Sequence, residues 1–280
     1  MPPLILDGTS LARRRAAAIA GRAAAVRARR GEPPCLLLVA FAEPDGHVPH
    51  VQRKLRACAD AGVKTELVSL PAGASTDAAI RALHERLGRS RVDGVFLQFP
   101  FPAAIDGDSL AASVPSAVDV DIMTPALVTA YLERISPYPP VTVSAALLLL
   151  EHYDVEIAGL RGVVVADESP FAVMFREALS RCGARMAPLV PPSARDLDAL
   201  VSGAGLVVAA AARPGTVPAA MLRQGTVAID AGYFNPGGRG DIDASGGIGH
   251  LAALAPVPGG IGPMTVSALI ERVVEFAERA

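Results

Sequence analysis

The sequence predicts an α/β protein of two three-layer α/β domains with parallel sheets, the second Rossmann-like, with a cleft between them. Three observations lead to this prediction. Short apolar runs, typical of buried parallel strands, alternate with amphipathic helical stretches along most of the chain. A proline-rich stretch at 135–143 divides this alternation into two series. With 280 residues, the chain is long enough for two domains that each bury a core.

The first series begins with a helix. The Ala/Arg-rich stretch 10–31 starts with serine and ends with glycine, which is typical of a capped surface helix. The apolar run CLLLVAFA at 35–42 predicts a strand that is buried on both faces. The other elements of this series are expected as helices at 48–62 and 75–89 and as strands at 64–70 and 92–102. This order predicts a parallel sheet covered by helices.

The second series opens with an expected helix at 144–154. Strands are expected at 162–166, 184–190, 205–212 and 226–232, with helices at 171–183 and 194–204. Strand-helix-strand links of this kind are nearly always right-handed. An amphipathic helix that starts at the cap residue Thr265 closes the chain. We assign residues 1–139 and 264–280 to the first domain and residues 140–263 to the Rossmann-like domain.

The composition is that of a soluble globular protein. A formal net charge of −2 provides no field that would attract nucleic acid or an anionic membrane. The amino terminus lacks the pattern of a signal peptide, and the apolar run at 145–150 is too short to span a bilayer. The three cysteines form no CxxC pair, which argues against a disulfide framework and a zinc site. We expect a cytoplasmic protein.

Lys54 is the first candidate for chemistry. Only Lys54 and Lys64 are lysine among the 26 Lys and Arg residues, and burial can deprotonate lysine but not arginine. His50 lies four residues earlier, so both side chains share one face of the expected helix. A lysine desolvated beside a cleft could act as a general acid or base. A solvated helix face would explain the same spacing.

Gln98 and two aspartates form a second group of candidates. Gln98 follows an expected strand among apolar neighbours, so its amide either bonds to backbone or points into a cleft. Asp119 and Asp121 lie two residues apart on an extended stretch and are expected to face the same side. Because no His or Cys accompanies them, we expect no metal.

The most specific string in the chain is APVPGGIGPMT at 255–265. Two X-Pro bonds and closely spaced glycines constrain the backbone there immediately before an expected helix. A purely structural turn rarely needs so many constrained residues in a row.

These segments, in this order, resemble the bifunctional methylenetetrahydrofolate dehydrogenase/methenyltetrahydrofolate cyclohydrolase family. PVPGGIGPMT matches the family signature, and QFPFP resembles its Gln-Leu-Pro-Leu-Pro loop. DVD resembles Asp-Val-Asp-Gly, with Ile122 in place of the glycine, and AGLVVAAAARPG is similar to ADLLIVAVGKPG. The resemblance implies that the first domain binds folate and catalyses the reaction. It also implies a homodimer formed through the second domain.

The resemblance assigns a role to each matching residue. Lys54 is the implied catalytic lysine, Gln98 tunes it, and Asp121 holds the pterin ring. His50 replaces a tyrosine that stacks on the folate, and its ring could stack likewise or carry a second proton. The implied substrate-binding residues, in the floor of the cleft, are Pro258, Gly259, Gly260, Gly262, Pro263 and Thr265.

The expected phosphate loop of the second domain departs from the family. Where the family has Gly-x-Ser-x-x-Val-Gly-x-Pro, this chain has ADESPFAVM at 166–174, without a glycine. The lost glycines would allow close approach of the backbone to a pyrophosphate, and two added carboxylates would repel it. This pattern predicts a degenerate site in which NADP binding is doubtful, at Ala166, Asp167, Glu168 and Ser169.

We therefore expect a divergent family member that binds a tetrahydrofolate derivative. It would perform cyclohydrolase-type chemistry on the 5,10-methenyl or methylene bridge, with the hydride step in doubt. Three alternatives stay open. One is the intact NADP-dependent bifunctional enzyme, and another is methylene transfer from folate in a specialised biosynthetic pathway. The third is a non-catalytic paralogue, against which the joint presence of Lys54, Gln98 and Asp121 argues.

Overall fold

The computed structural model describes residues 2–42, 49–232 and 238–280, without the side chains of residues 49 and 50. The chain divides into two compact units. Unit 1 comprises Met1–Arg13 and Thr142–Thr265, and unit 2 comprises Arg14–Val141 and Val266–Ala280. The first 13 residues therefore belong with the second half of the chain, whereas the sequence analysis grouped them with the first domain. Every pairing between the described strands is parallel, and the predicted α/β class is confirmed.

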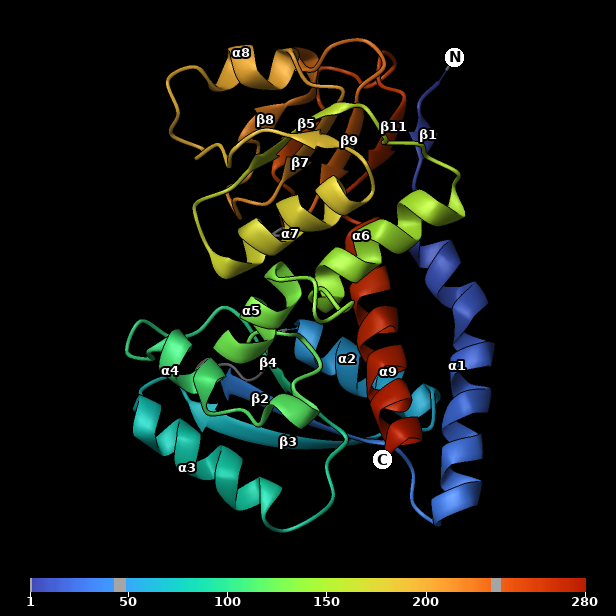
Figure 1. Cartoon of the computed structure of the whole chain (residues 1–280), viewed down its shortest axis with the longest axis vertical. Coiled ribbons are helices and arrows are strands. Elements are labelled where there is room, and N and C mark those ends of the chain that lie inside the picture. Colours follow the sequence, from blue (N-terminus) through green and yellow to red (C-terminus); the bar gives the residue numbers. More distant parts are fainter. Residues whose placement is uncertain (1, 43–48, 233–237) are drawn as a thin grey trace. The chain divides into compact units, whose positions relative to one another are not determined.

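A three-stranded sheet of order β3-β2-β4 forms the centre of unit 2 (Figure 1). β2 spans Cys35–Ala42, β3 spans Lys64–Pro71 and β4 spans Gly94–Leu97. In the central strand β2, the residues from 35 to 40 are all buried, as the continuous apolar run predicts. Leu37 pairs with Glu66 of β3 on one side and with Val95 of β4 on the other.

Helices lie on both faces of this sheet. Leu37 of β2 packs in one core with Leu83 of α3 (Thr76–Leu87) and Leu110 of α4 (Gly107–Ala112). On the opposite face, a β carbon at Gly94 would contact Val273 of α9. The other helical segments of unit 2 are most of α1 (Gly8–Arg30), α2 (Pro49–Asp60), a 3-10 turn (Ser116–Val118), α5 (Pro125–Leu132) and most of α9 (Ile261–Arg279).

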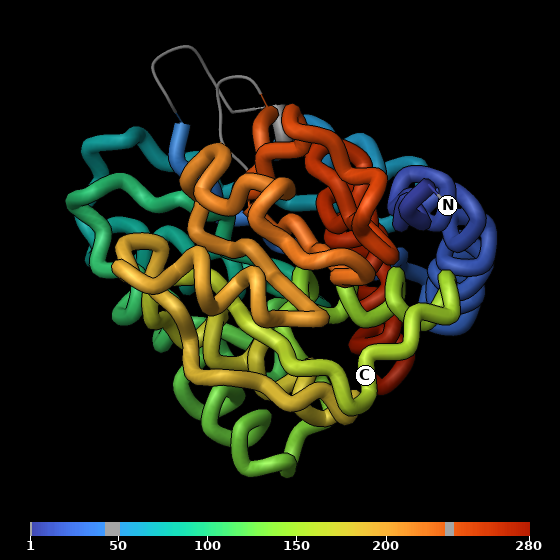
Figure 2. Tube along the Cα trace, turned by 90° about the horizontal axis from the view of Figure 1, so that it is seen from above, coloured from blue at the N-terminus to red at the C-terminus, as the bar shows by residue number. Residues whose placement is uncertain are grey.

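Helices α1 and α9 lie side by side in unit 2, although they come from opposite ends of the chain (Figure 2). Arg22 of α1 forms ion pairs with Glu271 and Glu278 of α9, at 3.2 and 2.7 Å. Arg15 of α1 also pairs with Glu271. These partly exposed pairs align the two helices but contribute little stability individually.

Unit 1 is built on a six-stranded sheet of order β1-β11-β9-β7-β5-β6. Leu4 of β1 pairs with Ala253 of β11, so the start of the chain forms one edge of the sheet. Its strands are β1 (Leu4–Ile5), β5 (Arg161–Val165), β6 (Arg185–Met186), β7 (Leu206–Ala209), β9 (Val227–Asp230) and β11 (Ala253–Ala255). A separate pair joins β8 (Val217–Pro218) to β10 (Ile242–Asp243), and a 3-10 turn follows β8 at Ala219–Met221.

Helices also cover both faces of the sheet in unit 1. Leu197 and Val201 of α8 (Leu197–Ser202) pack against Val163 and Val207 of the sheet. Helix α7 (Pro170–Arg181), which buries Phe175, lies on the other side of the sheet (Figure 1). Helix α6 (Val141–His152) leads into this unit. The three-layer arrangement is the one that strands alternating with helices predict.

Two helices begin earlier than the sequence predicts. Helix α6 starts at Val141, inside the proline-rich stretch, and α9 starts at Ile261. Thr265 is therefore not a cap, because its hydroxyl donates to the carbonyl of Ile261 at 3.2 Å within the helix. Pro263 is tolerated in the first turn, where a backbone N–H has no partner inside the helix.

Four described non-glycine residues lie in the left-handed backbone region: Ile122, Arg134, Asp154 and Ala212. Two of them bear on the resemblance. Ile122 has a φ of 58° and Ala212 a φ of 52°. Both stand where the family text has glycine, and each L residue costs about 1–2 kcal/mol in this conformation. At Ala212, the buried carboxylate of Asp241 holds the loop by accepting the amides of Ala211, Ala212 and Arg213 at 2.5, 2.9 and 2.7 Å.

Candidate active site

Helix α2 places Lys54 on its buried face. Val51, Lys54 and Cys58 follow each other at helical spacing and are all buried, with Lys54 only 8% exposed. The solvated-face interpretation of Lys54 is therefore wrong. His50 lies in the first turn of the same helix, and its side chain lies outside the described part of the structure.

Gln98 accepts a hydrogen bond from the ammonium group of Lys54. The backbone of Gln98 continues from β4 by donating to the carbonyl of Val39 at 2.9 Å. This register holds its amide oxygen 2.8 Å from Nζ of Lys54, while its Nε2 donates to the carbonyl of Phe99. Nζ also lies 5.1 Å from the centre of the Phe96 ring. The lysine thus has one neutral acceptor and an aromatic face as neighbours.

Burial lowers the pKa of Lys54 from 10.5 to about 8. The nearby charge of Asp121 opposes this shift, and Arg53 adds to it. At neutral pH a lysine of this kind holds a proton that it can release, and a useful fraction is already neutral. Such a group can act as an acid or a base in the pH range of a cell.

Asp119 and Asp121 lie two residues apart but differ in their burial and their hydrogen-bond partners. Asp119 is buried, and its carboxylate accepts the amides of Asp121, Met123 and Thr124 at 3.1, 2.8 and 2.7 Å. It therefore fixes the turn that carries Asp121. Asp121 keeps part of its surface exposed and accepts the amide of Val141, at 3.0 Å.

Desolvation raises the pKa of Asp121 to about 7, with a further increase from Asp119 and opposition from Arg272 and Lys54. A carboxyl group with this pKa exchanges its proton near neutral pH. Unit 2 therefore contains a buried lysine and a partly exposed carboxyl group that influence each other's protonation. Among the described residues, no cluster of three His, Cys, Asp or Glu side chains could hold a metal ion.

Arg272 of α9 is a site residue that the sequence analysis did not identify. It is 6% exposed and donates to the carbonyls of Val120 and Pro139, one on the segment before Asp121 and one before α6. Its guanidinium lies 4.5 Å from the ring centre of Tyr138. The signal was an arginine on the apolar stripe of an amphipathic helix, three residues after Leu269.

The segment 256–263 is a packing element of unit 1. Gly260 donates to the carbonyl of Pro256 at 2.8 Å, and Thr9 donates to the carbonyl of Gly259 at 3.1 Å. A β carbon on Gly8 would lie only 1.9 Å from the carbonyl oxygen of Gly260. The unusual composition thus permits close backbone contact with the start of α1. Substrate contact by this segment stays a prediction.

The loop after β5 leads into a capped helix. Ser169 caps α7 by accepting the amide of Ala172 at 3.2 Å, and Pro170 occupies the first helical position. Asp167 and Glu168 are exposed. Arg213, from the loop after β7, lies 2.8 Å from Asp167 and offsets one of the two added carboxylates. A polyanion therefore meets less repulsion here than the loop sequence predicts.

Together, the Rossmann-like unit and the buried lysine define a two-unit α/β enzyme with an acid–base centre and a nucleotide-binding fold. Two family models match the chain. The catalytic domain of tetrahydrofolate dehydrogenase/cyclohydrolase matches residues 6–121, and its NAD(P)-binding domain matches residues 140–280. The chain belongs to the tetrahydrofolate dehydrogenase/cyclohydrolase family.

Relatives and solved structures agree with this assignment. The bifunctional protein FolD 1 of Streptomyces avermitilis is 34% identical over 98% of this chain and 94% of its own length. FolD 1 of Salinispora arenicola is 32% identical over 100% of this chain and 99% of its own length. The methylenetetrahydrofolate dehydrogenase-cyclohydrolase of Trypanosoma brucei, solved with NADP and an inhibitor, is 26% identical with a TM-score of 0.91. That alignment covers 100% of this chain and 98% of the trypanosomal one.

These matches correct one expectation. The doubt about NADP rested on the loop at 166–169, but the match to the NAD(P)-binding domain includes this loop and the whole of its sheet except β1. The doubt is not borne out. Arg213, from a loop far away in the sequence, pairs with Asp167, and a scan of the phosphate loop alone does not reveal this pair. In the described part of the chain, no helix has the length and apolar character needed to cross a membrane.

Proposed function

We propose that this protein is an NAD(P)-dependent bifunctional enzyme that oxidises the methylene bridge of 5,10-methylenetetrahydrofolate and hydrolyses the resulting methenyl bridge. The observation that carries this proposal is the buried Lys54, 2.8 Å from Gln98, with a pKa of about 8. The bifunctional names of the relatives support the pairing of the two activities. This proposal replaces the interpretation in which the hydride step is lost.

In the hydrolytic step, neutral Lys54 accepts a proton from a water molecule as its oxygen attacks the cationic methenyl carbon. The resulting ammonium then donates a proton to the ring nitrogen whose bond to that carbon breaks. The new hydroxyl group on the carbon releases its proton to solvent in the same step and becomes the carbonyl of a formyl group on the other nitrogen. Gln98 orients the lysine and supplies no negative charge, so the lowered pKa is preserved. Asp121 anchors the pterin ring, because an ionised carboxylate can accept hydrogen bonds from the N–H groups of the ring.

The same proposal gives the remaining candidates their roles. His50 stacks on the folate or carries a second proton. Substrate contacts are assigned to Pro258, Gly259, Gly260, Gly262, Pro263 and Thr265, and their support is the sequence string alone. Because this string contacts the rest of unit 1, its substrate role needs an independent test by substitution at Pro258.

The dinucleotide would be held by the residues between β5 and α7. The start of α7, capped by Ser169, and the charge of Arg213 support a phosphate-binding role for this end of the sheet. When bound, NAD(P) supplies a hydride acceptor for the methylene carbon. The chain itself must hold the phosphates despite their repulsion by Asp167 and Glu168. Arg213 reduces this repulsion because it pairs with Asp167.

The deciding experiment measures both activities in the wild type, Lys54→Met and Arg56→Met. Arg56 is exposed on the same helix and controls for a lost charge. We expect Lys54→Met to lower methenyltetrahydrofolate hydrolysis by about 10²–10⁴-fold, with Arg56→Met unchanged. Unchanged hydrolysis in Lys54→Met would refute the role of the lysine. Absence of NAD+ or NADP+ reduction by the wild type with methylenetetrahydrofolate would refute the hydride step.

We also propose that the enzyme is a homodimer formed through unit 1 and acts in the cytoplasm. The family resemblance supports the dimer. Leu4 and Ile5 of the edge strand β1 leave 42% and 41% of their surfaces exposed, which is unusual for large apolar side chains. Light scattering on the purified protein would give the mass directly, and a monomer at all concentrations would contradict the proposal.

A further inference from the structure

Unit 2 contains a cavity at the amino ends of its three strands. Its volume is about 420 Å³, in the range of small-molecule sites. Cys35, the first residue of β2, and Lys64, the first residue of β3, lie in its wall. Lys54 and Gln98 follow the opposite, carboxyl ends of β2 and β4. The cavity is therefore separate from the candidate active site.

Cations dominate the wall of this cavity. Arg30, Lys64, Arg89 and Arg91 line it together with Ser90, and Glu32 is the single carboxylate among its lining residues. These side chains come from the end of α1, the start of β3 and the loop between α3 and β4. Such an excess of positive charge over a hollow surface favours an anionic ligand.

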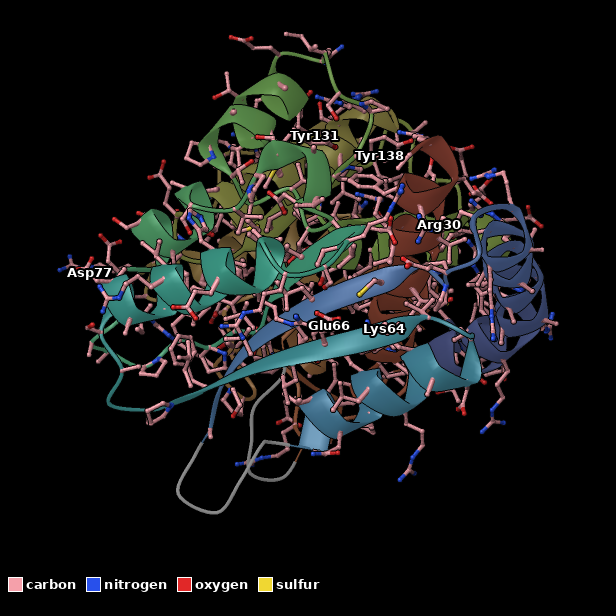
Figure 3. All side chains as sticks on the ribbon, turned by 90° about the horizontal axis from the view of Figure 1, so that it is seen from below. Arg30, Lys64, Glu66, Asp77, Tyr131 and Tyr138 are labelled. Carbon is pink, nitrogen blue, oxygen red and sulfur yellow. The ribbon has the colours of Figure 1, made fainter. Side chains whose placement is uncertain are left out.

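Two buried carboxylates behind the wall hold these cations in place. Glu66 is 7% exposed and binds Lys64 at 2.7 Å, with Arg86 on its other oxygen. Figure 3 shows Lys64 and Glu66 together on β3, and Ser90 also donates to Glu66, at 3.2 Å. Each carboxylate thus neutralises one charge while it positions two cations.

Asp93 is 4% exposed and plays the same part for the arginines. It binds Arg30 through both carboxylate oxygens, at 2.8 and 2.5 Å, and Arg91 at 3.4 Å. Its second oxygen also accepts the amide of Cys35 at 2.8 Å, which ties the cluster to β2. Arg30 is therefore a fixed guanidinium, whereas Lys64 and Arg91 keep 53% and 45% of their side chains exposed.

The exposed cations retain the capacity to bind a ligand. An ammonium has three N–H donors and a guanidinium has five. Lys64 can keep its bond to Glu66, and Arg91 its contact with Asp93, while both donate to an anion. Lys64 is one of the two lysines in the chain, in which arginine supplies nearly all the other positive charges.

We propose that this cavity binds a small molecule through a phosphate group. Lys64 and Arg91 supply exposed donors, and Arg30 adds the one N–H that its bonds to Glu32, Pro33 and Asp93 leave over. These donors approach from three different segments, which suits the several oxygens of a tetrahedral dianion better than one planar carboxylate. The volume exceeds that of inorganic phosphate, which leaves room for the rest of a phosphorylated small molecule. This inference is independent of the proposed folate chemistry.

The test titrates inorganic phosphate and succinate into the full-length protein by calorimetry at low ionic strength. The informative variant is Lys64→Met/Arg91→Gln, which leaves Glu66 with Arg86 and Asp93 with Arg30. Arg81→Gln removes an exposed charge elsewhere on α3 as a matched control. Lys54→Met tests separation from the candidate active site. Thermal unfolding verifies that each variant is folded.

We expect one equivalent of phosphate to bind the wild type, Arg81→Gln and Lys54→Met alike. Its affinity should fall at least about tenfold in the double variant and weaken in the wild type with added salt. Succinate should bind more weakly than phosphate. The proposal is overturned if the wild type binds no phosphate, if the folded double variant binds it equally well, or if succinate binds as tightly.

Discussion

Gly8 and Gly260 are in backbone contact, because a β carbon on Gly8 would lie 1.9 Å from the carbonyl oxygen of Gly260. The start of α1 therefore rests on the loop before α9, and the hydrogen bond from Thr9 to Gly259 fixes the same contact. A single methyl group added at Gly8 would clash with the backbone of Gly260, which cannot move aside as a flexible side chain could.

Gly8→Ala should therefore destabilise the protein by about 3 kcal/mol, the upper end of the usual cost of overpacking. Gly21→Ala is the matched control on the same helix, because a β carbon added there would meet open space within 4 Å. That control should gain up to about 1 kcal/mol from helix propensity. Urea unfolding measures both, and equal stability of the two variants would contradict the contact.

The buried ammonium of Lys54 predicts a specific dependence of stability on pH. Its pKa falls from 10.5 in the unfolded chain to about 8 in the folded one, so the unfolded chain binds more protons between these values. This group's contribution to stability therefore rises with pH across that window and is least favourable below pH 8. The stability of Lys54→Met relative to the wild type should therefore be greatest below pH 8.

This relative stability should fall by about 3 kcal/mol between pH 8 and pH 10.5. Denaturant unfolding of both proteins at several pH values gives the difference directly, and other titrating groups cancel in it. A difference that is constant with pH would show that Lys54 has an ordinary pKa in the folded protein.

Gln98→Glu tests how the neutral partner sets the pKa of Lys54. A carboxylate 2.8 Å from Nζ would raise this pKa by roughly one unit or more. The kcat/KM profile for methenyltetrahydrofolate hydrolysis should then move to higher pH, with a lower rate at pH 7. Gln98→Met, which adds no charge, should not move the profile upward. An unshifted profile in Gln98→Glu would separate Gln98 from the titrating group.

Arg272→Met should affect Asp121 through charge. Removal of the guanidinium removes one cause that lowers the pKa of Asp121, so this pKa should rise further above 7. Less Asp121 is then ionised at neutral pH, and folate affinity should fall with KM affected more than kcat. The free energy of unfolding should fall by about 2–3 kcal/mol, because the carbonyls of Val120 and Pro139 lose a charged donor.

Arg279→Met is the control for Arg272→Met, because Arg279 also lies over Tyr138, at 5.2 Å, but on an exposed surface. It should leave KM unchanged. Equal KM values in the two variants would mean that Arg272 has only a structural role.

The charge pair of Arg213 and Asp167 predicts opposite changes in NADP affinity. Asp167→Asn removes a carboxylate from the proposed phosphate loop and should tighten binding, whereas Arg213→Gln should weaken it. Each change should be within about tenfold, because both side chains are more than half exposed and screened by solvent. Fluorescence titration of NADPH measures both. The same direction of change in both variants would exclude the compensation.

Local patterns predicted much of the fold and less of the site. The apolar run at 35–42 became the buried strand β2, because such a run has no other stable place. The two-residue strand β1 was not predicted, because its pairing with Ala253 depends on sequence that lies far away. Lys54 was predicted from the scarcity of lysine, Gln98 from its place after a strand and Asp121 from its spacing with Asp119. The tertiary contacts of Arg272 and Arg213 were not visible in their sequence neighbours.

The left-handed backbone at Ile122 and Ala212 bears on how lost glycines are interpreted in a divergent sequence. At both positions a larger residue adopts a backbone conformation that glycine adopts readily, where the family motif has glycine. At Ala212, the three amides that Asp241 accepts compensate for the strain. A carboxylate from another segment can therefore hold a loop in a conformation that glycine usually occupies. In this chain, the absence of a glycine from a family motif does not by itself mean that the loop follows another path.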